Sequence, residues 1–134
     1  MTVGLDTSVL VRLLTGEPRD LALVALGYFL ERKEAGDRLL VSDWVVAEAY
    51  YALQHHYGAS KKDALDALRA FLANPGVEAT AELVAVLAIP GLESAKPGFI
   101  DRVIHRNYLS SGAEEGATFE RAAAKLPHVR VLAP

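Results

Sequence analysis

The chain has 134 residues, of which 51% are hydrophobic and 23% are charged, with a formal net charge of −3 and no cysteine. This composition excludes a disordered chain, and the lack of cysteine excludes disulfide frameworks, thiolate zinc sites and cysteine nucleophiles. The negative charge argues against a large non-specific affinity for nucleic acid, but it leaves room for an enzyme that reaches phosphates through a bound metal and a few arginines.

Targeting and membrane segments are not expected. No charged leader with an apolar core of about 7–15 residues precedes the first strand-like segment, so the sequence predicts no signal peptide. No stretch approaches the roughly 18 apolar residues that a membrane span requires. These features favour a cytoplasmic protein without a membrane segment.

Short apolar runs alternate with longer segments of helical periodicity. We expect strands at Thr2–Leu5, Arg38–Val41, Val77–Ala79, Ala117–Phe119 and His128–Leu132. We expect helices at Thr7–Leu14, Glu17–Ala35, Asp43–His56, Lys61–Ala73, Ala81–Ala88 and Gly98–Leu109, and a short one ending at Leu126. Gly36 is expected to end the second helix, and Ser60 is a candidate N-cap. Because strands joined by crossover helices pair in parallel, the pattern predicts one α/β domain over residues 1–134.

Two carboxylates in the first half of the chain are candidate site residues. Asp6 directly follows the first expected strand, where ligands of parallel sheets usually bind. Aspartate is also a preferred N-cap, and for Asp6 taken alone capping is the simpler explanation. Glu48 shares a helix face with Trp44 and Tyr51. A carboxylate on such a stripe needs a cation, a donor or open solvent, so Glu48 is either a ligand or a half-buried residue that reaches water.

Asp101 and Glu120 are the candidates in the second half. Asp101 lies in the first turn of an expected helix, where the dipole favours an acid in any case. Glu120 follows the fourth expected strand and could equally be a surface acid. If all four point to one end of the sheet, they repel unless a cation joins them, and all-oxygen ligands select Mg²⁺ or Mn²⁺. Such an ion activates water and neutralises charge on a phosphodiester, so the pattern is nuclease-like.

The ordered set of segments resembles the PIN-domain family, specifically the VapC-like toxins, over nearly the whole chain. The segments that carry the resemblance are Gly4–Leu14, Val45–Glu48, Phe99–Asp101, Thr118–Leu126 and Val129–Leu132. The resemblance implies a three-layer α/β/α sandwich with a central parallel five-stranded sheet. It places Asp6, Glu48 and Asp101 in the three principal acidic positions and Glu120 in the fourth.

The resemblance also implies an activity and partners. The chain would be a Mg²⁺- or Mn²⁺-dependent endoribonuclease that cleaves RNA by metal-activated water, and the toxin of a type II toxin–antitoxin system. It would form a homodimer and bind a small VapB-like antitoxin that occludes the acidic site. Ser8 and Thr118 would support the first and fourth acids.

Three features depart from the family pattern, and the first two of them, Glu120 and Gly98, keep an alternative open. Glu120 replaces the usual aspartate, Gly98 stands where many relatives have a second aspartate, and the fourth strand is normally more apolar than Gly112–Ala117. The alternative is a catalytically impaired PIN domain that acts as a binding scaffold. A phosphotransfer domain is disfavoured, because Ser8 occupies the position at which a haloacid-dehalogenase phosphatase needs its second aspartate.

The basic residues and histidines each allow a functional and a structural interpretation. Arg12, Arg102 and Arg121 are candidate RNA contacts, as are Arg106 and Lys125, because forked or charged donors suit phosphate; exposed charges paired within the molecule explain them equally well. His105, one turn after Asp101, is either a general acid or RNA contact, or a structural residue. His55 and His56 point about 100° apart on a helix and are expected to contact the last carbonyls instead of a metal.

Overall fold

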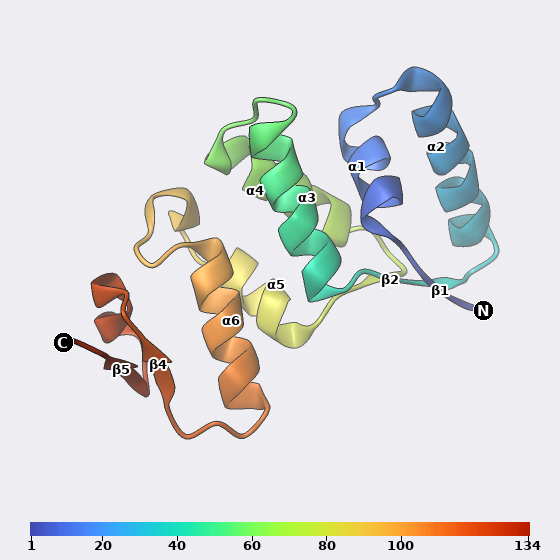
Figure 1. Ribbon diagram of the computed structural model, residues 1–134. Helices are drawn as coiled ribbons and strands as arrows, with labels where there is room; N and C mark the ends of the chain where they lie inside the picture. The colour runs from blue at the N-terminus through green and yellow to red at the C-terminus, as the bar shows by residue number, and fades with distance from the viewer. The chain divides into compact units, whose positions relative to one another are not determined.

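A computed structural model describes the chain from Met1 to Pro134. The protein is α/β, with six α-helices, two short 3₁₀ helices and five strands. It divides into two compact units, Met1–Thr80 and Ala81–Pro134 (Figure 1). None of its helices combines the length and apolar character needed to cross a membrane.

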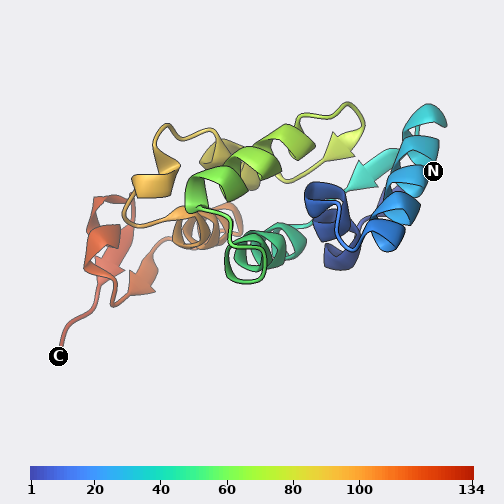
Figure 2. The ribbon, with the colours of Figure 1, turned by 90° about the horizontal axis from the view of Figure 1, so that it is seen from above.

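The N-terminal unit holds a parallel sheet of three strands in the order β1-β2-β3. The strands are β1 (Thr2–Gly4), β2 (Arg38–Leu40) and β3 (Val77–Glu78). Figure 2 shows β2 and β3 side by side and pointing the same way. The helices are α1 (Thr7–Thr15), α2 (Arg19–Glu34), α3 (Asp43–His55) and α4 (Lys61–Leu72), with α1 packed against both α2 and α3.

The C-terminal unit is smaller. It contains α5 (Ala81–Leu87), η1 (Leu92–Ser94), α6 (Phe99–Ser110), β4 (Gly116–Thr118), η2 (Arg121–Lys125) and β5 (Val129–Val131). β4 and β5 form a two-stranded parallel sheet in which Ala117 lies opposite Arg130. Helices α5 and α6 pack against each other, and η2 packs against β5.

The expected strands and helices are all present, but the strands lie in a sheet of three and a sheet of two instead of one sheet of five. The strands are short, at two or three residues each. Such short strands form few hydrogen bonds with their neighbours. The apolar pattern that predicts where each strand lies therefore does not predict which strand edges pair. β1 and β4 each have a partner on one side only.

Local signals explain where the helices begin and end. Ser60 caps α4 as expected, its Oγ accepting from Asp63 N at 3.0 Å, and Ser42 caps α3 in the same way through Val45 N at 3.2 Å. Gly36 follows α2 with φ of 75°, a left-handed conformation that glycine adopts at little cost. The second helix begins at Arg19, two residues after the expected Glu17, because Pro18 takes the N-cap position.

The core of the N-terminal unit fixes the ends of the elements that carry the candidate acids. Leu10 of α1, Leu39 of β2, Val46 of α3 and Leu65 and Leu68 of α4 are all 0% exposed. Leu10 is one helical turn from Asp6, and Val46 is two residues from Glu48. Burial of these neighbours therefore holds the start of α1 and the middle of α3 in place while both acids stay at the surface.

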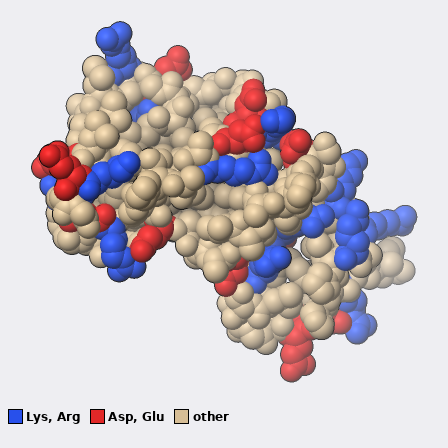
Figure 3. Space-filling model, turned by 180° about the vertical axis from the view of Figure 1, so that it is seen from behind, with Lys and Arg blue, Asp and Glu red and all other residues tan.

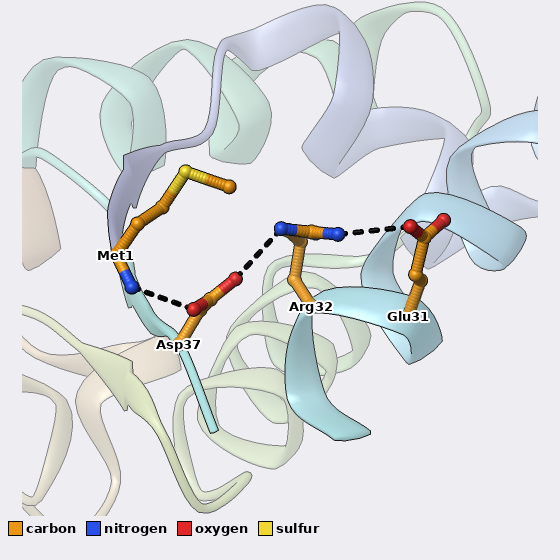
Figure 4. Close-up of polar contacts among 4 residues, drawn as sticks. All are labelled: Met1, Glu31, Arg32 and Asp37. Carbon is orange, nitrogen blue, oxygen red and sulfur yellow. Dashed lines mark hydrogen bonds and ion pairs between the residues drawn. The ribbon is translucent and has the colours of Figure 1, made fainter. Parts of the chain in front are cut away.

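An ion-pair network ties β1 to the turn before β2 (Figure 4). Asp37, with a side chain only 7% exposed, accepts from the Met1 ammonium at 2.7 Å and from Arg32 Nη1 at 2.9 Å. Arg32 Nη2 also donates to Glu31 Oε1 at 2.8 Å. The hydrogen bond from the ammonium, helped by the charge of Arg32, holds the pKa of Asp37 below its ordinary value. Nothing in the sequence pattern singled out this carboxylate.

Candidate active site

Asp6 lies at the carboxyl end of β1 and is the N-cap of α1. Its Oδ1 accepts from Thr7 N at 2.8 Å, so the capping role considered from the sequence is present. Its Oδ2 has only a long contact, 3.5 Å from Ser8 Oγ. The side chain is exposed and is in no ion pair. Capping therefore uses one oxygen of the carboxylate and leaves the other turned to solvent.

Glu48 is linked to the same corner of the unit by a hydroxyl. Thr7 Oγ1, on the residue after Asp6, donates to Glu48 Oε1 at 3.0 Å and bridges the start of α1 to the middle of α3. Glu48 is exposed and has no basic partner. The start of α1 and the middle of α3 thus hold two carboxylates beside one threonine, and neither carboxylate forms a salt bridge. Sequence reasoning singled out Ser8 beside Asp6 and missed Thr7, although Thr7 carries the only other hydroxyl next to that acid.

The aromatic stripe around Glu48 faces solvent. Trp44 is 82% exposed and Tyr51 is 61% exposed, and the Tyr51 ring contacts the His55 ring at 4.0 Å between centroids with the ring planes tilted by 33°. The stripe is thus more exposed than the half-buried rim considered from the sequence, and the Glu48 carboxylate reaches water. That exposure is also what a carboxylate needs in order to meet a hydrated cation and a large substrate.

Asp101 and Glu120 belong to the C-terminal unit. Asp101 is exposed in the first turn of α6, and Glu120 is the exposed N-cap residue of η2. Thr118 Oγ1 accepts from the Glu120 backbone N–H at 3.0 Å, so Thr118 shapes this turn through the main chain and not through the carboxylate. No hydrogen bond or ion pair occupies either carboxylate.

A metal ion would find oxygen ligands here but no complete cage. No group of three or more His, Asp or Glu side chains stands close enough together to hold a metal ion by itself. Asp6 and Glu48 supply carboxylate oxygens, with the hydroxyls of Thr7 and Ser8 beside them. This all-oxygen donor set fits Mg²⁺ or Mn²⁺, which complete their coordination with water and substrate phosphates.

A hollow of about 550 Å³ opens beside Asp6. Asp6, Ser8, Arg12 and Tyr28 bring polar groups to its lining, and the other residues that line it are apolar or glycine. Arg12, a candidate RNA contact, is half-buried and has only a long contact, 3.5 Å from Nη1 to the Ser8 carbonyl. A cationic side chain therefore lines the same mostly apolar hollow as Asp6, without forming a salt bridge to it.

No family model, curated protein or solved structure matches the chain. A function is therefore inferred from the residues and the geometry of the site.

Some of the remaining candidate residues are exposed at the surface, and others form hydrogen bonds within the C-terminal unit. Arg121 is exposed at the start of η2, and the Nε of half-buried Arg102 donates to the Pro97 carbonyl at 2.7 Å. His105 is 8% exposed, and its Nε2 lies 2.6 Å from the Pro127 carbonyl, so it has a structural role in the C-terminal unit. His55 and His56 are exposed at the end of α3.

Proposed function

We propose that the chain is a Mg²⁺- or Mn²⁺-dependent endoribonuclease of the PIN type, acting in the cytoplasm as the toxin of a toxin–antitoxin pair. The observation that carries the proposal is the pair of exposed carboxylates, Asp6 and Glu48, joined through Thr7 at the carboxyl end of β1. Two anions with no basic partner at this end of a parallel sheet are suited to a divalent cation. The segments that resemble the family contain both of them.

The residues would divide the work as follows. Asp6 and Glu48 would hold the ion through the oxygens that capping and Thr7 do not use. When bound, Mg²⁺ or Mn²⁺ supplies a water of lowered pKa and neutralises charge on the phosphodiester. Thr7 fixes the Glu48 carboxylate by donating to Oε1, and Ser8 lies where its hydroxyl can orient Oδ2 of Asp6. Asp101 and Glu120 would complete the acidic site.

We further propose that β1 and β4 pair to give the single five-stranded sheet of a PIN domain. Each is an edge strand, and an unpaired edge offers backbone groups to another strand. In an all-parallel sheet the carboxyl ends of β1 and β4 would lie at the same edge, which carries Asp6 and Glu120. A helix that crosses back before β4 starts at that edge too, which would bring Asp101 there.

Amide hydrogen exchange tests this sheet. Leu5 N donates to the Leu40 carbonyl and Gly116 N to the His128 carbonyl, so the alternate residues Gly4 and Ala117 turn their amides to the outer edges of the two sheets. We expect the Gly4 and Ala117 amides to exchange slowly, as the Leu5 and Gly116 amides should in any case. Fast exchange at Gly4 and Ala117 beside slow exchange at Leu5 and Gly116 would rule out the joined sheet.

Cleavage of total cellular RNA tests the activity itself. We expect defined fragments in Mg²⁺ or Mn²⁺, and none in EDTA or with Glu48→Gln, a variant that keeps the acceptor for Thr7 but loses the charge. Fragments that persist in EDTA would contradict metal-dependent cleavage. No cleavage by antitoxin-free protein under any condition would favour the impaired PIN domain that serves as a binding scaffold.

The proposed partners follow from the same resemblance to the VapC-like toxins. We propose a homodimer that binds RNA as substrate and a small VapB-like antitoxin as inhibitor. Growth arrest on expression of the chain, relieved by the product of a neighbouring short reading frame, would support the toxin role.

A further inference from the structure

The C-terminal unit contains a hollow of about 750 Å³ bounded by α5, α6 and η2. Its charged lining consists of three cations, Arg102, Arg106 and Lys125, and one acid, Glu82. Figure 3 shows Lys and Arg side chains gathered on this part of the molecule, at the lower right of the view. The volume lies within the range of about 300–1,000 Å³ that small-molecule sites occupy.

The three cations form no salt bridge, although several arginines elsewhere in the chain do. Arg32, Arg38, Arg69 and Arg130 each form a salt bridge, whereas Arg102, Arg106 and Lys125 form none. Arg102 and Arg106 stand four residues apart on one face of α6, an arrangement of like charges that weakens a helix. An anion bound between them would remove that repulsion.

Hydrogen bonds within the chain hold two of the side chains that line the hollow in place. Arg102 is half-buried, and its Nε donates to the Pro97 carbonyl at 2.7 Å, which fixes the guanidinium and leaves both Nη groups for a ligand. The buried His105 ring forms part of the wall. Its Nε2 must carry a proton to donate to the Pro127 carbonyl at 2.6 Å, so that nitrogen is already engaged. A Cβ at Gly116 would come within 2.9 Å of His105 Nδ1, so glycine lets β4 approach this wall closely.

We propose that this hollow binds a phosphate group, held by the guanidinium forks of Arg102 and Arg106 and by the ammonium of Lys125. Guanidinium groups match phosphate oxygens in pairs, and a fixed fork loses less entropy on binding than a free one. Ser110, also in the lining, adds a hydroxyl that can donate to a phosphate oxygen. The phosphate can belong to an RNA backbone or to a free nucleotide or inorganic phosphate. The proposal needs none of the four acids and stands apart from catalysis.

The test is binding in EDTA, so that no metal-dependent cleavage occurs. A fluorescent single-stranded oligoribonucleotide is titrated with the wild-type chain and with Arg106→Gln/Lys125→Gln, whose two sites are exposed. We expect the double variant to lose affinity about tenfold or more, since one charge-assisted hydrogen bond to phosphate is worth about that factor. The slope of log K against log salt should fall by about 1.4, at about 0.7 for each lost contact with a single strand.

A matched control variant removes two positive charges from the N-terminal unit instead. Arg19→Gln/Lys61→Gln changes two exposed cations of the N-terminal unit that begin α2 and α4. We expect it to leave affinity within about twofold; an equal loss in both double variants would overturn the proposal as a general effect of net charge.

Two small probes identify the source of the phosphate. If inorganic phosphate or AMP displaces the oligoribonucleotide and shifts the NMR signal of the Arg102 Nε–H, the hollow takes a free phosphate group. If only the oligoribonucleotide shifts that signal, the hollow takes a phosphodiester of the backbone. If none of the probes shifts it, the proposal is wrong, whatever the outcome of the RNA cleavage assay.

Discussion

Asp6→Asn should reduce Mg²⁺-dependent RNA cleavage by at least about 100-fold, because loss of even an outer partner of a metal site costs about 10–100-fold. Asparagine caps helices as well as aspartate does, so the bond from Thr7 N should persist and the fold should be retained. The change therefore removes a negative charge from the site without removing the cap. Initial cleavage rates of a labelled RNA, with protein from identical purifications, measure the effect.

Asp20→Asn is the matched control for this substitution. Asp20 is also an exposed acid at the start of a helix, in the first turn of α2, and it is not part of the candidate site. We expect it to cleave as the wild type does, and both variants to melt near the wild-type temperature. Isothermal titration should show weaker Mn²⁺ binding by Asp6→Asn alone. Full activity of a folded Asp6→Asn variant would remove Asp6 from the site and with it the proposed mechanism.

Asp37→Asn should give one of the largest losses of stability among single polar substitutions. It leaves Arg32 and the Met1 ammonium without their shared carboxylate in a position that is 7% exposed, and removing one partner of a buried ion pair is strongly destabilising. Thermal melts followed by circular dichroism at pH 7 should show a clearly lower Tm for the variant than for the wild type.

The same network sets a pH dependence. The pKa of Asp37 in the folded protein lies below its ordinary value, so the stabilisation is complete above about pH 4 and is lost as the pH falls through the folded pKa. The difference in Tm between wild type and Asp37→Asn should accordingly shrink below pH 4. Glu31→Gln, at a carboxylate whose side chain is 70% exposed, should change Tm little at any pH. Equal melting of wild type and Asp37→Asn at pH 7 would show that the network adds nothing.

The positions of the elements could be predicted because the signals for them are local. Apolar periodicity placed α3 and α4, Ser60 and Gly36 marked helix ends, and the expected strand at Ala117–Phe119 is displaced by one residue from β4. The arrangement of the strands depends instead on which edges meet over long distances. β4 consists of Gly116, Ala117 and Thr118, which bring little apolar surface to direct that choice.

The candidate site was predictable in part for the same reason. The order of strand and aspartate placed Asp6 at the end of β1, and helical spacing placed Glu48 between Trp44 and Tyr51 on one face of α3. The Thr7 bridge depends on how α1 packs against α3, which spacing along either helix does not encode. The unpaired state of Arg102, Arg106 and Lys125 likewise appears only when every acid of the chain has been placed.

The charged amine at Met1 has a practical consequence for producing the protein. An affinity tag fused ahead of Met1, or acetylation of the amine, would turn the ammonium that meets Asp37 into an uncharged amide and crowd a position where Asp37 is buried. The last residues, Leu132 to Pro134, are exposed and follow the final strand. A purification tag is therefore better placed at the carboxyl end. Melting temperatures of amino-terminally tagged protein would lack the contribution of the ion pair between the Met1 ammonium and Asp37.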